Sequence, residues 1–175
     1  MYLGIFMKGE GMYQIGDYVV KVNSGVCQVK DIVEMEQMAG AKGKYYLMVP
    51  RDDANAKLYV PVDGKNANVR NVMSGEEAKA FIERIPEIAV AWIESDKLRE
   101  QEYKAAIRSG SPEQLVSIIK NIYIRNQQRM EQGKKHTTVD ERYFKQAENI
   151  LYSELAFALD KEKSEIGQLI AHVFV

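Results

Sequence analysis

The chain has 175 residues, of which 46% are hydrophobic and 28% are charged, and its formal net charge is −1. These proportions are ordinary for a globular protein, and no apolar run approaches the roughly 20 residues that span a bilayer. The single cysteine excludes an internal disulfide and fits a reducing cytoplasm. We therefore expect a cytoplasmic protein that has no membrane partner.

Residues 1–11 precede the first recognisable pattern, which begins at Met12. They do not contain a basic region followed by a long apolar core, so they do not predict a signal peptide. Lys8-Gly-Glu-Gly reads as the translation of a purine-rich ribosome-binding site upstream of Met12. We interpret residues 1–11 as a non-native or disordered extension and Met12 as the physiological start, which an intact mass of the endogenous protein would test.

Residues 12–73 are predicted to form a small all-β domain. Val, Ile, Tyr and Met dominate five strand-like segments, at 13–22, 26–36, 44–50, 56–62 and 68–73, which Gly, Asn, Asp and Lys separate. Short strands with glycine-rich turns are typical of a small barrel or sandwich.

Two residues give local detail within these strands. Asp31 shares the predicted core face of its strand with Cys27 and Val29, an anomaly that a β-bulge would resolve. Pro61 cannot donate to a strand ladder, which predicts that 56–62 is an edge strand or contains a bulge. An edge strand can accept a strand from another protein.

Residues 74–175 are predicted to form a compact bundle of four or five helices, so that the whole chain is an α+β protein of two domains. Ser74 and Glu77 form a capping box that starts the first helix, and Pro86 interrupts it. We expect the second helix from about Glu87 to Arg108, with Trp92 within it.

Clear start and stop signals mark the remaining helices. Ser111-Pro-Glu-Gln starts a third helix, with Ser111 as its N-cap, and Gly133 ends it. Thr138 is expected to cap a fourth helix, and a short fifth helix is expected at Lys163–His172.

Residue patterns typical of catalysis or of cofactor binding are missing. His136 and His172 have no cysteine or second histidine at ligand spacing, so we predict no metal site. Cys27 lies on a predicted strand without an activating partner and is interpreted as a buried structural thiol. Phosphate-binding and dinucleotide-binding glycine motifs are missing as well. We predict a non-enzymatic protein that has no catalytic residues, no cofactor and no small-molecule substrate.

Basic residues concentrate in the helical part, because residues 97–145 hold eleven Lys/Arg against six Asp/Glu. For any single residue a solvated helix face with i,i+4 ion pairs is the better interpretation. As a group they form a candidate phosphate-contacting surface. The candidate DNA-contacting cations are Lys97, Arg99, Lys104, Arg125, Arg129, Lys134 and Lys135.

Trp92 is the only tryptophan, and two interpretations compete for it. Large aromatic residues at helical spacing are usually buried, so the residues alone favour a core anchor. The alternative is an exposed wedge that contacts or unstacks bases in a minor groove.

Several motifs together resemble the CarD/CdnL family of bacterial transcription regulators over about residues 12–160. In the β part they are Ile15-Gly-Asp-Tyr-Val-Val, Gly25-Val-Cys-Gln-Val, Tyr45-Tyr-Leu-Met-Val, Tyr59-Val-Pro-Val and Val69-Arg-Asn-Val. In the helical part they are the single tryptophan, Ser109-Gly-Ser, the Arg125/Arg129 helix and Ala147-Glu-Asn-Ile-Leu-Tyr-Ser-Glu-Leu-Ala.

The resemblance implies a Tudor-like or SH3-like barrel that binds the β subunit of RNA polymerase, a module shared with the transcription-repair coupling factor. It also implies that the helical domain contacts promoter DNA weakly and without sequence specificity, at the upstream edge of the melted bubble. Trp92 becomes the candidate wedge that helps to hold the open complex. The polymerase-contacting candidates, on the strands at about 33–38 and 56–61, are Glu34, Glu36, Lys57, Tyr59, Val60 and Pro61.

Two features depart from the family pattern. Trp92 stands about one helical turn further from Ser109-Gly110 than the family leads us to expect. Glu36 and Tyr59 occupy positions where some relatives have basic residues.

The resulting prediction is a cytoplasmic regulator, associated with the nucleoid through RNA polymerase, that stabilises the open promoter complex. The alternative is a protein–protein adaptor whose barrel binds polymerase or another machine while the bundle recruits a second protein without DNA contact. The two differ in what they require of Trp92: exposure beside a basic surface favours DNA, and burial beside an apolar groove favours the adaptor.

Overall fold

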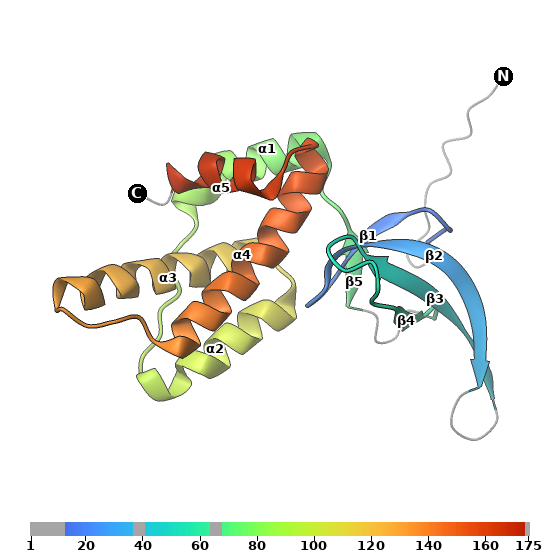
Figure 1. Ribbon diagram of the computed structural model, residues 1–175, viewed down its shortest axis with the longest axis horizontal. Coiled ribbons are helices and arrows are strands. Elements are labelled where there is room, and N and C mark those ends of the chain that lie inside the picture. The colour runs from blue at the N-terminus through green and yellow to red at the C-terminus, as the bar shows by residue number, and fades with distance from the viewer. Residues whose placement is uncertain (1–12, 37–40, 64–67, 174–175) are drawn as a thin grey trace.

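The computed structural model of the chain describes residues 13–36, 41–63 and 68–173. The expected extension at residues 1–11 and the proposed start at Met12 lie outside the described residues. Figure 1 shows a β-sheet at one end of the molecule and a bundle of helices at the other. Within the described residues, no helix combines the length and the apolar character needed to cross a membrane.

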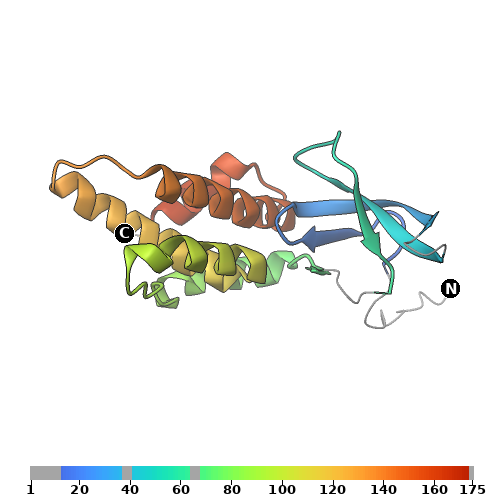
Figure 2. The same cartoon turned by 90° about the horizontal axis from the view of Figure 1, so that it is seen from below.

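Five antiparallel strands form one sheet. They are β1 (Tyr18–Lys21), β2 (Gly25–Glu36), β3 (Lys42–Pro50), β4 (Leu58–Pro61) and β5 (Val69–Asn71). Their spatial order is β4-β3-β2-β1-β5, so β4 and β5 are the two edges. The N-terminal β domain is thus confirmed, but the predicted barrel is not closed within the described residues, because the edge strands, of four and three residues, do not pair with each other. Instead, the long β2–β3 hairpin curves away from the bundle (Figures 1 and 2).

The bulge predicted at Asp31 is present. The register between β2 and β3 shifts between Val29 and Asp31, which turns the Asp31 side chain to solvent. A bulge adds a residue to one strand only, so it bends the hairpin at this point. The edge position predicted for the Pro61 strand is also confirmed.

A small core lies on one face of the sheet. Its buried residues are Val19, Cys27, Val29, Tyr46, Met48 and Val60. Burial raises the pKa of the Cys27 thiol to about 11, which supports its interpretation as a structural residue.

The helical half contains α1 (Gly75–Arg84), the short 3-10 helix η1 (Ile85–Glu87), α2 (Asp96–Ser109), α3 (Pro112–Glu131), α4 (Thr138–Leu159) and α5 (Lys163–Ala171). The Ser74–Glu77 capping box is confirmed, with both reciprocal hydrogen bonds formed. Ser111 caps α3 as predicted. The cap of α4 is Thr137 rather than Thr138, because the Thr137 side chain accepts from the Asp140 backbone N–H.

The helix predicted from Glu87 to Arg108 is wrong in its first part. After η1 the chain runs without helix through residues 88–95, and α2 begins only at Asp96. We call residues 88–95 the strap. Pro86 disfavours a continuous helix, and polar side chains from α3 bond the carbonyls that a helix would have used, as described below.

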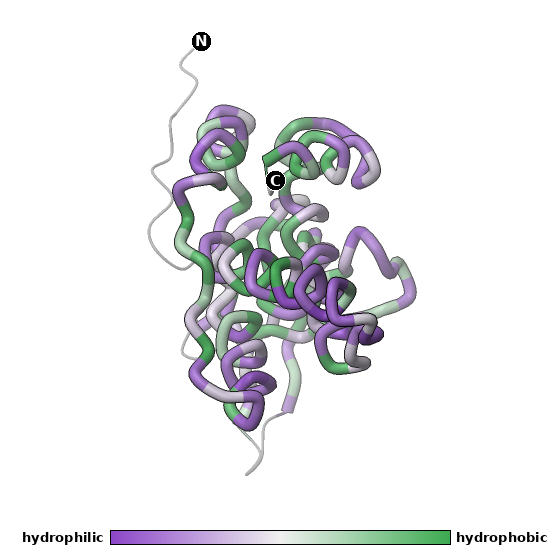
Figure 3. Tube along the Cα trace, turned by 90° about the vertical axis from the view of Figure 1, so that its left-hand side faces the viewer, coloured by the Kyte–Doolittle hydropathy of each residue, from purple (hydrophilic) through white to green (hydrophobic). Residues whose placement is uncertain are grey.

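Hydrophobic and hydrophilic residues are interspersed along the helical part of the chain (Figure 3). Its core is lined by residues at helical spacing on α3 and α4. The largest fully buried side chains there include Leu115, Ile118, Ile119, Ile122, Leu151 and Leu155.

Polar contacts join the sheet to the bundle. Arg70 of β5 makes a bidentate ion pair with Glu154 of α4, with both N···O distances 2.6 Å. Asp52, in the turn after β3, accepts from Ser153 Oγ at 3.0 Å and from Lys163 Nζ at 2.6 Å. The C-terminal half of α4 therefore docks against the sheet, and Figure 2 shows this helix reaching it.

Apolar contacts reinforce the same interface. The rings of Tyr18 and Phe157 lie 4.7 Å apart between their centroids, and the Arg51 guanidinium lies over the Phe157 ring, 5.0 Å from its centroid. Gly110, at φ +65°, lies so close to the end of β1 that a Cβ there would meet Cγ2 of Val22, the residue after β1, at 2.6 Å. A side chain at this position would push the two halves apart.

Candidate functional site

The strap presents Trp92 to solvent. The side chain of Trp92 is 90% exposed, so its interpretation as a core anchor is wrong. Its neighbours Ala91 and Ile93 are partly buried against the bundle core. This in-out-in alternation is the pattern of an extended chain, whose side chains point in opposite directions at successive residues. This alternation could have been read from Ala91-Trp-Ile in the sequence, but the segment was assigned to a helix instead.

Three side chains of α3 hold the strap in place. Ser117 Oγ donates to the Ala89 carbonyl at 2.7 Å, and Asn121 Nδ2 donates to the Ala91 carbonyl at 2.9 Å. Lys120 Nζ donates to the carbonyls of Ile85 and Ile88 at 2.6 and 2.8 Å. Desolvation lowers the pKa of the Lys120 ammonium. Lys120 therefore serves as a backbone clamp, a role that sequence reasoning missed.

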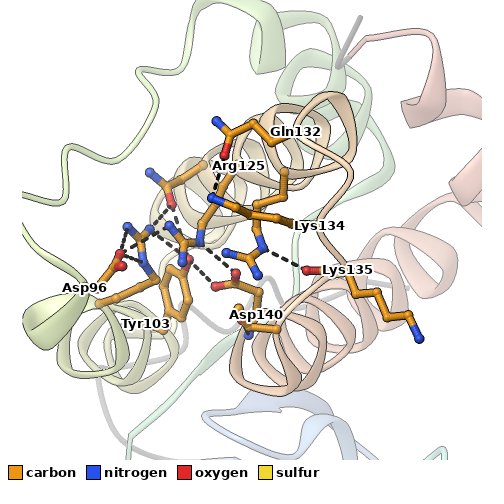
Figure 4. A network of polar contacts seen from close by, with 11 residues as sticks. Asp96, Tyr103, Arg125, Gln132, Lys134, Lys135 and Asp140 are labelled. Carbon is orange, nitrogen blue, oxygen red and sulfur yellow. Dashed lines mark hydrogen bonds and ion pairs between the residues drawn. The ribbon is translucent and has the colours of Figure 1, made fainter.

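A polar network inside the bundle supports the α3 side chains that hold the strap (Figure 4). Asp140, at the start of α4, is fully buried and accepts from Arg125 Nε at 2.9 Å and from Tyr103 Oη at 3.1 Å. The same hydroxyl lies 3.3 Å from Asn121 Oδ1, so Tyr103 shares its single proton between the Asp140 and Asn121 oxygens. Burial raises the pKa of the Tyr103 hydroxyl to about 12, so it stays protonated as a donor. The network thus links α4, α2 and α3 to the backbone beside Trp92.

Arg99 and Arg125 belong to this network. Arg99 pairs with Asp96 at 2.8 Å and also donates to Asn121 Oδ1, and its side chain is 13% exposed. Arg125 pairs with Asp96 at 3.2 Å and with Asp140, and is 21% exposed. The hydrogen bond from Arg99 and the charge of Arg125 lower the pKa of Asp96. Both guanidiniums are therefore engaged inside the bundle, although each was a candidate phosphate contact.

The other candidate cations lie at the same end of the bundle or along α2. Lys104 pairs with Glu100 at 3.2 Å, Arg129 Nε donates to the Lys135 carbonyl at 2.8 Å, and Lys134 Nζ donates to Gln132 Oε1 at 3.0 Å. Lys97 and Lys135 are exposed, and neither side chain has an ion pair or hydrogen bond within residues 13–36, 41–63 and 68–173. Figure 4 shows the Lys135 side chain extending away from the network.

The second candidate surface is the β4 edge and the β2–β3 hairpin. Tyr59 is 47% exposed and Lys57 precedes it in an exposed position, whereas Pro61 is half-buried. Val60 is only 3% exposed and belongs to the sheet core, so its side chain cannot contact a partner. Val60 is the Cα partner of Tyr46, and residues paired across strands point to the same face.

The acidic candidates Glu34 and Glu36 are exposed on β2, directly opposite Lys44 and Lys42 of β3. This register places each glutamate of β2 opposite a lysine of β3 along the hairpin. Ile32 and Met35 are also exposed here, and sequence reasoning did not select them. The sequence feature that could have identified them is the run of apolar residues that continues along β2 past the bulge, where no described helix covers the sheet.

Two family models match the chain. The CarD-like/TRCF RID domain matches residues 13–73, and the CarD C-terminal domain matches residues 93–171. The chain belongs to the CarD/CdnL family. Members are RNA polymerase-interacting transcription regulators, and the first matched domain is the one that interacts with polymerase. A comparison with curated proteins gave no match.

The CarD matches leave residues 74–92 uncovered, and this stretch includes Trp92 and most of the strap. The first domain match ends just after β5, and the second begins one residue after Trp92. Trp92 itself therefore lies outside both matches, whereas the residues that separate it from Ser109-Gly110 lie inside the second match.

Proposed function

We propose that this CarD-family chain binds the β subunit of RNA polymerase through its sheet and contacts promoter DNA at the upstream edge of the bubble through its helical domain. By holding DNA in the melted arrangement it stabilises the open complex. The single observation that carries the DNA part is the exposure of Trp92 on a strap that the bundle holds fixed.

An exposed indole on an ordered backbone is suited to insertion. Burying a tryptophan ring removes on the order of 200 Å² from water, a gross gain of about 5 kcal/mol. Unstacking a base step costs a few kcal/mol, so a modest net gain survives. Because Ser117, Lys120 and Asn121 already fix the strap, little further backbone entropy is lost on binding.

The exposed cations at the far end of the bundle would supply phosphate contacts. Lys97 and Lys135 are the best candidates, because their charges are not engaged by any described residue. Lys134 and Arg129 could join them by giving up single neutral hydrogen bonds. Arg99 and Arg125 are assigned instead to positioning the strap.

Tethering explains why so small a basic surface would be sufficient. A domain held beside the promoter by polymerase acts at a high effective concentration, so contacts too weak to hold free DNA still count. The proposal therefore implies feeble binding to free duplex and a clear effect on open-complex lifetime.

For the polymerase contact, the β4 edge is the supporting feature. An edge strand has unpaired backbone groups that can accept a partner strand. Tyr59 adds an exposed aromatic ring at this edge, and such rings are enriched at the centres of protein interfaces. The alternating charges of the β2–β3 hairpin would border that contact.

The DNA contact is tested by comparing Trp92→Ala with wild type in an open-complex lifetime assay with polymerase from the same source. Losing 1–2 kcal/mol of contact should shorten the lifetime about 5- to 30-fold. Ile124→Ala, which removes another exposed apolar side chain from α3, is the control and should leave the lifetime unchanged. An unchanged lifetime for Trp92→Ala, with polymerase binding intact, would reject the DNA contact and favour the adaptor alternative.

The tether is tested separately with the isolated β-subunit lobe. Tyr59→Arg and Glu36→Lys should weaken saturable binding, whereas Glu131→Lys, at the end of α3 away from the sheet (Figure 1), should not. Absence of binding by the wild-type chain at tens of micromolar would reject the β-subunit assignment.

A further inference from the structure

A cavity of about 300 Å³ lies between α3, α4 and α5. From α4 it is lined by Phe144, Glu148 and Tyr152, which are four residues apart and so lie on one face of the helix. Tyr123 contributes a third aromatic ring from α3. The volume is at the small end of the range for ligand sites. This cavity is separate from the strap and from the β4 edge.

Glu148 is the one charged group among the lining residues. It is half-buried, and its hydrogen-bond partner is the Tyr152 hydroxyl, at 3.0 Å from Oε1. Burial raises the pKa of the Glu148 carboxyl. No Lys, Arg or His lies within ion-pair distance of it in the described part of the chain.

The two fully buried carboxylates of α4, by contrast, each have an arginine partner. Asp140 pairs with Arg125, and Glu154 pairs with Arg70. A desolvated carboxylate normally needs such a partner, because removing its charge from water is costly. The fold supplies an arginine twice along this helix and leaves Glu148 facing an open, aromatic cavity.

Gly167 keeps that cavity open on the α5 side. Its φ is not in the left-handed region, so the backbone does not require glycine here. Glycine in a helix interior destabilises it relative to alanine. A Cβ at this position would meet Tyr152 Cε2 at 3.6 Å, and longer side chains would enter the space beside the ring.

We propose that this cavity is a binding site for a small organic cation, an ammonium group attached to an apolar or aromatic body. Glu148 is the counter-ion, and Tyr123, Phe144 and Tyr152 are the aromatic walls. Aromatic rings attract cations through their faces, and several rings beside one carboxylate are the usual receptor for a substituted ammonium. The proposal does not depend on DNA or polymerase binding.

The test uses the full chain and benzyltrimethylammonium chloride as the probe. We expect saturable shifts of the backbone amide signals of Gly167 and Ala171 in NMR spectra, with a dissociation constant of roughly 1 mM or tighter. Benzyl alcohol, which has the ring without the charge, and sodium chloride at equal ionic strength should each produce no saturable shift at these amides.

Two variants remove the site in different ways. Glu148→Gln removes the counter-ion and should weaken probe binding about tenfold or more, and Gly167→Leu should abolish binding by filling the cavity. Both should keep the wild-type helical content, because one removes an unpaired charge and the other a helix-interior glycine. Glu131→Gln, an exposed acid elsewhere on α3, is the matched control and should bind like wild type. Three results would each overturn the proposal. They are no saturable binding of the probe at about 20 mM, 20 times the expected dissociation constant; binding of benzyl alcohol as strong as that of the probe; and wild-type binding of the probe by folded Glu148→Gln.

Discussion

Breaking the Arg70–Glu154 ion pair should destabilise the protein far more than breaking an ordinary surface pair. The Glu154 side chain is 2% exposed and, without Arg70, would keep only the hydrogen bond from the Met73 backbone N–H, at 3.1 Å. Removing one partner of a buried pair costs about 3–5 kcal/mol. Arg70 is 32% exposed, so water can reach the vacated position, and we take the lower end, about 3 kcal/mol, for Arg70→Met. At an m-value of about 2.5 kcal/mol/M this lowers the urea midpoint by about 1.2 M.

Urea unfolding followed by circular dichroism would measure this difference. Arg84→Met is the matched control, because Arg84 pairs with Glu113 at 3.6 Å on an exposed surface and its loss should cost less than about 0.5 kcal/mol. The double variant Arg70→Met/Glu154→Met should be more stable than Arg70→Met alone, since it no longer buries an unpaired charge. Equal midpoints for Arg70→Met and Arg84→Met, or additive losses in the double variant, would refute the reasoning.

Three further predictions concern single side chains. Asn121→Ala should cost about 1–3 kcal/mol and increase the mobility of Trp92, measured by fluorescence anisotropy. Asn126→Ala is its control, since the buried Asn126 Oδ1 has no hydrogen-bond partner in the described residues, and equal anisotropy in the two variants would contradict the anchor. Cys27, with its pKa raised from 9.0 to about 11, should react with a disulfide reagent about 100-fold more slowly than an ordinary thiol near pH 8, and rapid labelling of the native protein would contradict its burial. Because burial raises the pKa of Glu148 above 4.5, its folded state favours the protonated form, and the stability this gives is lost as pH rises through the folded pKa. Glu148→Gln should therefore be more stable than wild type at neutral pH, and the difference should shrink at acidic pH, as measured by thermal unfolding; a constant difference across pH would contradict it.

Local signals in the sequence predicted local structure well. The Ser74 and Ser111 caps, the bulge at Asp31 and the edge position of Pro61 each depend on the chemistry of a few neighbouring residues. The family resemblance was carried by several such segments in order, and the family models confirm it.

Apart from the one-residue error in the cap of α4, the failures depend on residues far apart in the chain. The strap is extended because Ser117, Lys120 and Asn121 bond its carbonyls, and these residues lie about 30 positions away from it. The periodicity of residues 87–108 does not depend on those bonds and cannot reveal them. It therefore predicted a helix that included Trp92. The open sheet, likewise, reflects strand pairing that propensity alone does not fix.

Charge counting also overestimated the free basic surface. Arg99 and Arg125 contribute to the positive balance of residues 97–145, yet both are paired with Asp96, and Arg125 pairs with buried Asp140 as well. Asp140 lies in the first turn of α4, 40 or more residues from the strap. Spacing in the sequence therefore gave no indication that Asp140 and the strap belong to one network. A local excess of arginine therefore indicates phosphate contacts only when those arginines are not paired with carboxylates of the same domain.

The helix α4 joins the two proposed surfaces. Its first turn holds Asp140, which supports the Trp92 strap through Tyr103 and Asn121, and its C-terminal half holds Glu154 and Phe157 against the sheet. Its 22 residues span about 33 Å. A tether raises effective concentration only when its geometry allows both sites to engage at once. A single helix fixed at both ends by buried charges keeps that geometry, so the position of Trp92 relative to a bound polymerase would be set by α4 rather than by the chain between β5 and α1.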